Sequence, residues 1–324
     1  MVLDDGSLDG TPEALDAIRD PRIRVLRAPR NAGLAGNWNR ALEMVTTPYL
    51  ALCHQDDVYQ PGFLETMLAL LESRPRAFVA HCKAQTIDAE GRPFSLPADR
   101  YRAAFWPPED PYERGGRAEL EMLRRGSYIY TSTAVFRTSA VRRIGLFSAE
   151  YKQSIDWNYW MRGVLAGFTI VGTRQPLASY RRHPRMTTRQ TEADLSRYTD
   201  EIRLVTWIAG AALAAGLADD PRPDFRIVVN TVLSELARRL AIGQRASARN
   251  LLRFARDVIP GFEGSPLCGL ARVGCACGRT GGRALGFAEA AWFSLLDVRR
   301  WVGGLRVPSR RLETLPGVQA KPTH

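Results

Sequence analysis

The segment YLALCHQDD, residues 49–57, is a short apolar run that stops at two adjacent carboxylates. Pro61 then stands where the first turn of a helix would begin, and apolar residues recur after it at helical spacing. A strand that ends in polar residues and leads into a helix is the repeating unit of α/β proteins, whose ligands bind at the carboxyl ends of strands. This segment therefore predicts an α/β domain with a ligand site at residues 54–57.

The same alternation extends on both sides of this segment. The predicted strands are residues 23–26, 77–81, 128–137, 169–171 and 178–180, and the predicted helices are residues 37–45 and 156–166. Strands separated by helices indicate a mainly parallel sheet. Residues 91–117 are rich in proline, glycine and charge, and we expect a loop there.

The alternation fades near residue 190, where helical patterns take over. We expect helices at 195–218, 225–242, 246–258 and 285–302, with an irregular stretch at 260–284 that is rich in glycine and cysteine. The sequence thus predicts three parts. They are an α/β domain at 1–190, a helical region at 191–305 and a tail at 306–324.

The composition is that of an ordinary globular protein. Of 324 residues, 45% are hydrophobic and 24% are charged. The net charge of +11 is spread widely without a long Lys/Arg block, so we expect no nucleic-acid partner. Five cysteines, an odd number, favour a reduced, cytoplasmic setting. The longest apolar run, residues 204–218, is shorter than the roughly 20 residues that span a bilayer, and we expect neither a signal peptide nor a transmembrane anchor.

Two clusters pair carboxylates at predicted strand ends. Asp4 and Asp5 precede a Gly-Ser turn, where a carboxylate can accept hydrogen bonds from a nucleobase or a ribose. A capping turn rich in aspartate explains the same residues. Asp56 and Asp57 offer hard oxygen ligands that suit Mg²⁺ or Mn²⁺ shared with a diphosphate. A capped turn before the next helix is the alternative there.

Two further clusters lie nearer residue 190. Asp156 stands among large aromatic residues, a setting that disfavours a charged carboxylate and suits a general base. It could equally cap the helix that begins there. His183 follows Arg181-Arg182, so it would contact a diphosphate or a metal, or else be an ordinary structural histidine.

In order and spacing, these clusters resemble the family 2 glycosyltransferases of GT-A fold. The matching motifs are the Asp-Asp-Gly-Ser turn at residues 4–7, Asn31-x-Gly33 with residues 37–41, Gln55-Asp56-Asp57 with Pro61, Gly145-x-Phe147 with Asp156-Trp157 and Arg162, and Tyr180-Arg181-x-His183. The resemblance covers residues 1 to about 190. It implies a GT-A domain, Rossmann-like in its sheet, that moves a sugar from a nucleotide-diphosphate donor to an acceptor hydroxyl.

The resemblance also implies a role for each matching residue. Asp4, Asp5, Asn39 and Asp56 would bind the nucleotide-sugar, and Asp56, Asp57 and His183 would hold a divalent cation, Mg²⁺ or Mn²⁺. Asp156 would deprotonate the acceptor hydroxyl, which attacks with inversion. The acceptor would be a saccharide or a lipid-linked saccharide in polysaccharide or cell-envelope synthesis, and the transferase would be of the hexosyl type.

Two departures from the family pattern bear on activity. A first strand and helix precede the Asp-Asp-Gly-Ser turn in the family, whereas Met1 lies three residues before Asp4 here. We expect either a true start upstream or a truncation that impairs activity. In addition, His54-Gln55 stands where the family's first metal-binding aspartate is usual, so the metal dependence rests partly on an imidazole.

Two other functions compete with the transferase. A non-catalytic relative that only binds nucleotide-sugars would share the same motifs. A sugar-phosphate nucleotidylyltransferase would need a glycine-rich basic loop near its start, and the sequence has none. Finally, the positive charge and Trp292, Phe293 and Trp301 predict peripheral contact with the inner face of the membrane. Packing of this segment against the catalytic domain or a second copy of the chain is the alternative.

Overall fold

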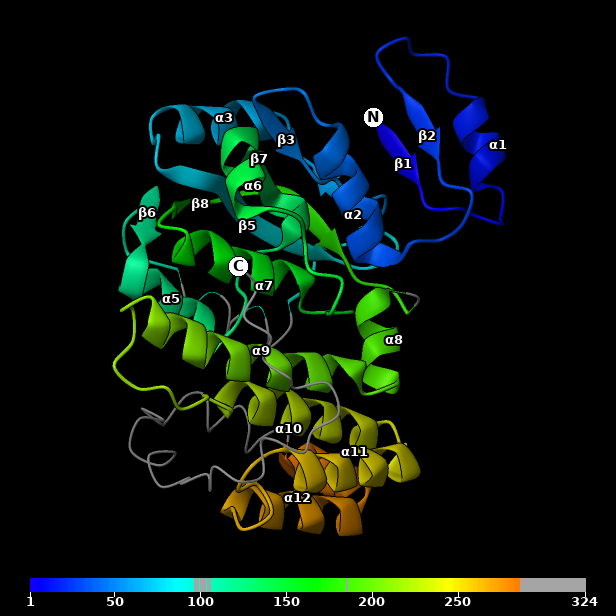
Figure 1. Cartoon of the computed structure of the whole chain (residues 1–324). Coiled ribbons are helices and arrows are strands. Elements are labelled where there is room, and N and C mark those ends of the chain that lie inside the picture. Colours follow the sequence, from blue (N-terminus) through cyan, green and yellow to red (C-terminus); the bar gives the residue numbers. More distant parts are fainter. Residues whose placement is uncertain (96–98, 100–102, 104–105, 185, 286–324) are drawn as a thin grey trace. The chain divides into compact units, whose positions relative to one another are not determined.

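The computed structural model describes residues 1–95, 99, 103, 106–184 and 186–285 (Figure 1). The chain forms two compact units, one of residues 1–191 with 214–218 and the other of residues 192–213 with those from 219 on. The predicted helix at 285–302, the predicted tail and the three aromatic residues expected at the membrane lie outside the described residues.

The first unit is an α/β domain. Its elements are β1 (Val2–Asp4), α1 (Thr11–Asp16), β2 (Val25–Arg27), α2 (Gly33–Met44), β3 (Tyr49–Ala51), β4 (Val58–Tyr59), α3 (Phe63–Glu72), β5 (Ala77–Ile87), β6 (Tyr112–Gly115), α5 (Gly116–Arg125), η1 (Thr131–Thr133), β7 (Ala134–Arg137), α6 (Thr138–Ile144), α7 (Ile155–Leu165), β8 (Thr169–Arg181) and α8 (Thr187–Ala193). The α/β class and the helical region that follows it are confirmed by the structure.

The strand directions differ from the expectation of a mainly parallel sheet. The strands of the larger sheet lie in the order β3-β7-β5-β8-β4, with β6 also on β8, and β1 and β2 form a separate parallel pair. Of the described pairs in the larger sheet, β5 and β8 are parallel and the others are antiparallel. The sheet is mixed because β7 runs antiparallel to both β3 and β5, and because β4 and β6 pair with β8 in the opposite direction. The sequence pattern did not indicate β4 and β6, which lie in a predicted turn and in a proline-rich stretch.

Strand β8 is continuous where the sequence predicted two short strands. The residues between Thr173 and Ala178, which include Pro176, stand opposite the single residue Lys83 of β5. This irregularity takes the proline out of the ladder, so pairing resumes at Ala178 and carries the strand on to Arg181. The extension matters because it delivers the segment at 180–183 to the candidate site.

Two helices cover the sheet with apolar side chains. The buried face of α3, formed by Phe63, Met67 and Leu71, packs on Ala80 and Val135 of the sheet. Helix α7 packs through aromatic contacts instead, with the rings of Trp160 and Phe136 stacked 5.5 Å apart. Gly163 of α7 lies over Phe78, where a β-carbon would come within 2.4 Å of the ring, so glycine lets the helix approach the sheet closely.

The second unit is helical, with α9 (Ser196–Ala214), α10 (Arg226–Ala241), α11 (Arg245–Val258) and α12 (Pro266–Cys277). The last helix falls inside the stretch predicted to be irregular. It forms because Ser265 caps its N-terminus by accepting from the Cys268 N–H, and because Pro266 suits the first turn. Within the residues that the structure describes, no helix combines the length and the apolar composition that crossing a bilayer requires.

Candidate active site

Four side chains form a carboxylate–imidazole cluster in the first unit, three of them from one turn and the fourth from a segment far along the chain. Asp56 Oδ2 lies 3.1 Å from Nε2 of His183, which follows β8. Asp57 Oδ2 lies 3.8 Å from Nδ1 of His54. One ligand atom each from His54, Asp56 and Asp57 lies within 4.8 Å of the others. The structure thus brings together Asp56, Asp57 and His183, which were expected to bind metal, and adds His54.

The inner half of this cluster has unused hydrogen-bonding atoms. The Asp57 side chain is only 1% exposed, and its Oδ1 accepts from the Arg181 N–H at 2.9 Å. Its Oδ2 and Nε2 of His54 have no hydrogen-bond partner among the described residues. Burial raises the pKa of Asp57, against hydrogen bonds from Ser132 and Arg181 that lower it, and burial lowers the pKa of His54.

One ring nitrogen of His54 and one oxygen each of Asp56 and Asp57, within 4.8 Å of one another, suit a divalent cation. Mg²⁺ and Mn²⁺ prefer carboxylate oxygens, and a neutral imidazole with a lowered pKa keeps a free lone pair to donate. The ring of His54 is fixed by stacking on Trp38, with centroids 5.5 Å apart. The side chains of His54, Asp56 and His183 are 25%, 28% and 25% exposed, against 1% for Asp57, so these three face the side from which a ligand would come.

Arg181 ties the cluster to the sheet. Its backbone N–H donates to Asp57, its Nε donates to the Asp56 carbonyl at 2.8 Å, and its Nη1 donates to the carbonyls of Asp88 and Ala89. The side chain and the backbone N–H of Arg181 therefore both hold the turn that carries Asp56 and Asp57. Sequence reasoning placed this arginine in a matching motif and gave it no role of its own.

Asp156 lies in the first turn of α7 and is half-buried. Its Oδ2 accepts from the Thr131 hydroxyl at 3.1 Å. Ser154 holds the N-cap position, so Asp156 is not the cap that the sequence left as an alternative. Its aromatic neighbours pack inward, and Trp157 Nε1 donates to the Leu123 carbonyl at 2.7 Å.

A three-residue segment links the metal-side cluster to Asp156. Thr131 hydrogen-bonds Asp156, the next residue, Ser132, hydrogen-bonds Asp57, and the ring of Tyr130 stacks on Tyr180 with centroids 4.5 Å apart. The sequence predicted a strand here, but only Ala134–Arg137 is one. The hydroxyl-rich residues 131–133 form a 3₁₀ turn, and their run of three hydroxyls was the one signal that could have revealed them.

Asp4 and Asp5 lie at the end of β1, and both carboxylates have local partners. Asp4 is buried, and its Oδ1 accepts from the backbone N–H and the hydroxyl of Ser7. Asp5 Oδ1 accepts from the Ala32 N–H at 3.0 Å, just before α2. The turn that the sequence offered as an alternative is therefore present at Asp4. Asp5, nearer the surface, stays a predicted contact of the nucleotide.

Asn39 has both polar atoms of its amide bound to one backbone position. Its Nδ2 donates to the Phe147 carbonyl at 2.9 Å, and its Oδ1 accepts from the Phe147 N–H at 2.8 Å. Arg162 of α7 donates to the carbonyls of Ile144 and Leu146 in the same turn. Several motif residues thus brace α2 against the turn before α7, and nucleotide binding by Asn39 stays a prediction.

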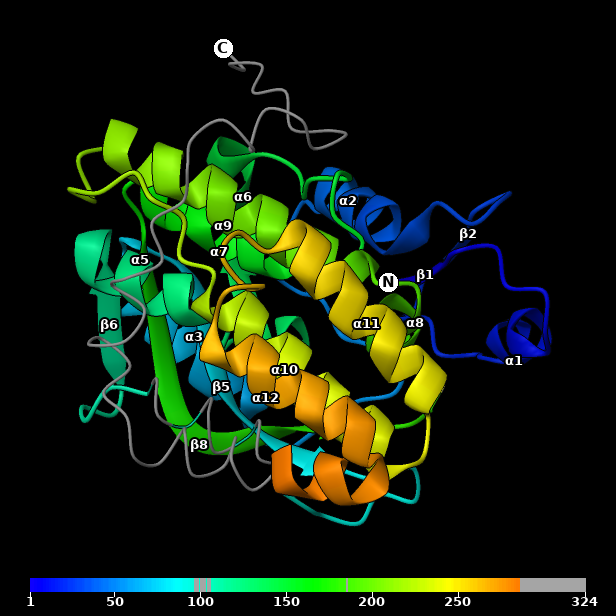
Figure 2. The same cartoon turned by 90° about the horizontal axis from the view of Figure 1, so that it is seen from below.

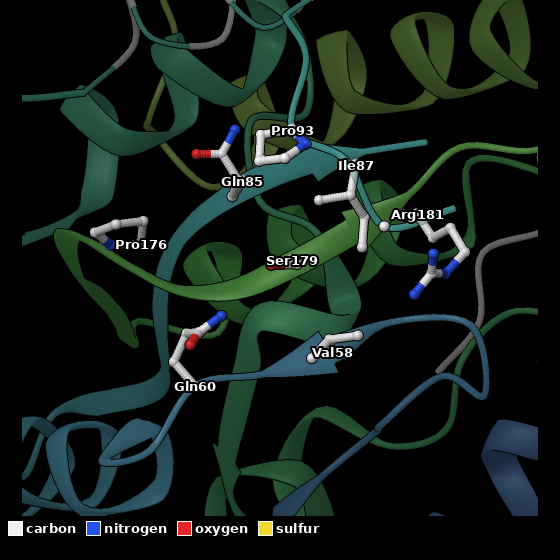
Figure 3. Close-up of a pocket in the computed structure, with 9 residues that line it drawn as sticks. Val58, Gln60, Gln85, Ile87, Pro93, Pro176, Ser179 and Arg181 are labelled. Carbon is white, nitrogen blue, oxygen red and sulfur yellow. The ribbon is translucent and has the colours of Figure 1, made fainter. Parts of the chain in front are cut away.

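A cleft of about 370 Å³ lies on the β4–β8–β5 part of the sheet and reaches the cluster through Arg181 (Figure 3). The amide side chains of Gln60 and Gln85 stand on either side of Ser179, and the prolines lie at its margin. Its lining residues are Val58, Gln60, Gln85, Ile87, Gly91, Pro93, Pro176, Ser179 and Arg181. Amide and hydroxyl groups among apolar surfaces suit a polar, uncharged ligand.

A buried chain of polar side chains lies apart from the cluster. His81 Nε2 hydrogen-bonds the Tyr112 hydroxyl, which lies 3.0 Å from that of Tyr128, and Tyr128 donates to Glu119 Oε1 at 2.6 Å. Burial raises the pKa of Glu119 to about 7 and lowers the pKa of His81 to about 3. Both groups are therefore neutral between about pH 3 and about pH 7.

Known sequences match the part of the chain that carries this cluster. Residues 1–145 match the family model described as glycosyl transferase family 2. An uncharacterised protein of Mycobacterium tuberculosis is 26% identical over 213 residues, which cover 64% of this chain and 65% of that protein. The succinoglycan biosynthesis protein ExoO of Rhizobium meliloti is 35% identical over 68 residues, 21% of this chain and 20% of that protein. Each of these matches spans less than two thirds of the relative's length.

Solved structures with similar chains were also found. The Staphylococcus aureus protein TarS, residues 1–349 in complex with UDP-GlcNAc, has a TM-score of 0.49 at 17% identity, covering 90% of this chain and 82% of that one. The mannosyltransferase PcManGT of Pyrobaculum calidifontis, with GDP-Man and Mn²⁺, has a TM-score of 0.45 at 16% identity, covering 91% and 77%. Residues 1–145 of the chain are thus similar to glycosyl transferase family 2.

Proposed function

We propose that this protein is an inverting glycosyltransferase of the hexosyl type that uses a nucleotide-diphosphate sugar and a divalent cation. The observation that carries the proposal is the pair of unused, buried atoms, Asp57 Oδ2 and His54 Nε2, beside the exposed Asp56–His183 pair. A buried carboxylate oxygen without a hydrogen-bond partner of its own is costly unless a cation pairs with it. The family match over the same residues supplies the reaction class.

A bound Mg²⁺ or Mn²⁺ would neutralise the charge that develops on the departing diphosphate. His54, Asp56 and Asp57 would hold it, with His183 beside Asp56. Arg181 contributes without touching the ion, because it fixes the turn that carries both aspartates. A site whose ligands are held in place in advance spends no free energy on reorganisation during the reaction.

Asp156 is the proposed general base. Its carboxylate, oriented by the Thr131 hydroxyl, would take the proton of the acceptor hydroxyl as that oxygen attacks the anomeric carbon. The bond between the anomeric carbon and the diphosphate oxygen breaks as the new bond forms, so the configuration inverts and the nucleoside diphosphate leaves with the electron pair.

The acceptor is proposed to be a saccharide, free or lipid-linked, in polysaccharide or cell-envelope synthesis. The succinoglycan biosynthesis relative supports a polysaccharide, and the amide-lined cleft next to Arg181 offers room for one part of such a chain. We further propose a cytoplasmic protein that contacts the inner face of the membrane peripherally.

The first test is a thermal-shift panel of UDP, GDP, dTDP and CMP, each with and without Mn²⁺. A ligand that binds only the folded protein stabilises it by mass action, so one nucleotide should raise the melting temperature and only with the metal. Asp56→Ala should abolish that shift, whereas Asp20→Ala, at an exposed acid paired with Arg22 far along the chain, should leave it intact. If no nucleotide shifts the protein, the transferase proposal fails.

The second test separates an enzyme from a non-catalytic nucleotide-sugar-binding relative. Asp156→Asn keeps the shape of the side chain and removes its basicity. We expect hydrolysis of the matching nucleotide-sugar, with water in place of the acceptor, to fall by about 10²–10⁴-fold while the nucleotide-induced shift is retained. Equal hydrolysis by the variant would remove Asp156 from the role of base.

A further inference from the structure

Helix α12 of the second unit has an exposed face that is apolar along its whole length. Leu270 is 49% exposed and Val273 is 61% exposed, one turn apart. Pro266, Ala276 and Cys277 continue the same face. The opposite face, with Cys268, Ala271 and Cys275, is buried against the unit. The helix contains one charged residue, Arg272, and a helix that is apolar all round is normally covered on both sides.

A row of arginines runs along the neighbouring helix, α11. Arg245, Arg249, Arg253 and Arg256 recur at spacings of four, four and three, so they share one stripe of α11. The two helices pack against each other and lie side by side in Figure 2.

Three contacts show that the arginine row follows α12 from end to end. The guanidinium of Arg245 lies against Gly278, just past the C-terminus of α12. Arg249 lowers the pKa of Cys275, against the larger effect of burial. At the other end, Arg256 and Arg272 both pair with Glu263. The basic stripe therefore lies beside α12 along its length, next to its buried side and its two ends.

The charge of this segment is concentrated. Residues 245–285 carry seven arginines against Asp257 and Glu263, a net charge of +5, whereas the whole chain of 324 residues carries +11. Arg249 and Arg253 are exposed, and the structure gives neither a salt bridge with a described residue. The positive charge next to α12 is thus available to an anionic partner.

The geometry points to a membrane-binding surface in which α12 lies in the lipid interface and the α11 arginines contact anionic headgroups. An apolar helix face with an adjoining basic stripe is the pattern of interfacial helices, since acyl chains accept the apolar side chains and guanidinium groups reach the phosphates. Charge complementarity selects an anionic surface over a neutral one. This inference concerns the second unit alone and adds a defined surface to the proposed peripheral contact.

The test is co-sedimentation of the full chain with vesicles of phosphatidylcholine alone or mixed with phosphatidylglycerol. The wild type should bind the mixed vesicles, bind the neutral ones weakly, and lose binding as salt is raised. The double variant Leu270→Asp/Val273→Asp should stay in the supernatant. Leu64→Asp, on the exposed surface of α3 in the first unit at 55% exposure, is the matched control and should bind like the wild type.

A second variant keeps the test independent of folding. Arg249→Gln/Arg253→Gln should weaken binding to the mixed vesicles by roughly tenfold or more while its melting temperature stays that of the wild type. Undiminished binding by both double variants would overturn the inference. So would a wild type that ignores vesicles and instead forms dimers that Leu270→Asp/Val273→Asp dissociates.

The vesicle assay contains no nucleotide and measures no transfer. Binding to vesicles without any nucleotide-induced shift would leave this surface standing and remove the transferase proposal. A nucleotide-induced shift without vesicle binding would do the reverse.

Discussion

The chain has two pairs of adjacent aspartates at strand ends, and the structure treats them in opposite ways. Asp4 and Asp5 follow β1, and their carboxylates accept from Ser7 and from the backbone of Ala32. The Asp57 side chain is almost completely buried, and one of its oxygens has no hydrogen-bond partner in the described part of the chain.

The difference lies in the hydrogen-bond partners of the two pairs, since one oxygen of Asp57 has none among the described residues. Ser7 donates to Asp4 within the first turn, and the Ala32 N–H donates to Asp5 from just before α2. His54 and His183 beside the second pair supply imidazoles, whose lone pairs and charge suit a shared cation.

The largest effect that this comparison predicts is on metal binding by Asp57→Asn. The amide keeps the acceptor for the Arg181 N–H and removes the charge that would bind a cation. We expect the affinity for Mn²⁺, measured by calorimetry, to fall by more than about 100-fold, beyond the loss usual for residues outside the ligand shell. The melting temperature without metal should not fall, because burial already disfavours the charged carboxylate.

The opposite pattern would reverse the comparison. If Asp57→Asn bound Mn²⁺ normally and melted at a lower temperature, Asp57 would be a structural acid and the cluster would lose its claim to be a metal site.

The second prediction concerns the pH dependence of stability and adds a further buried carboxyl, Glu119, to the comparison. Its pKa is raised from 4.5 to about 7 by burial, so the folded protein holds a proton that the unfolded chain releases. The stability this proton provides is fully present below pH 4.5 and is lost as the pH rises through 7. We expect the free energy of unfolding to fall by about 2 kcal/mol between about pH 5 and 7, and Glu119→Gln to remove that fall.

Chemical denaturation at several pH values measures this, and added Mn²⁺ separates the two buried acids. The metal should not alter the Glu119-dependent part of the pH profile, since Glu119 lies in the tyrosine chain and not in the cluster. A wild-type profile that keeps its slope in Glu119→Gln would assign the titration to another group.

The smallest effect concerns Asp4→Asn, the matched partner of Asp57→Asn. The variant keeps an oxygen for Ser7 but loses charge-assisted hydrogen bonding, which costs about 1 kcal/mol and lowers the melting temperature by roughly 2–4 °C. Affinity for Mn²⁺ should stay that of the wild type. A large drop in Mn²⁺ affinity would show that the two aspartate pairs do not differ as their hydrogen bonds indicate.

Much of the fold was predictable from local pattern. The apolar run at 49–51 and the helical spacing from Phe63 specify β3 and α3 directly. What the pattern could not supply was strand direction and the shortest strands. Val58–Tyr59 forms a strand only because β8 lies beside it, and residues 131–133 leave the strand geometry only because Asp156 and Asp57 accept their hydroxyls.

The sequence indicated the acidic residues and the histidine of the candidate site. It did not indicate the residues that hold them in place. Paired carboxylates, an acid at a helix start and a histidine after a strand all carry recognisable chemistry in sequence. The contributions of Arg181 and Thr131 depend on contacts across 124 and 25 residues of chain, and no local pattern reports them. The apolar face of α12 was missed for a different reason, because small residues and glycine suggested irregular chain.

The segment 130–132 touches Asp57 on one side and Asp156 on the other. A donor substrate that displaced Asp57 would also displace Ser132, which hydrogen-bonds it. Ser132 is the neighbour of Thr131, whose hydroxyl orients Asp156, the proposed base. Under the proposed mechanism, the two substrates would therefore not be independent, and the acceptor half of the reaction would be set only after the donor half is filled. The kinetic signature of such a linkage is an ordered addition, with the donor bound first.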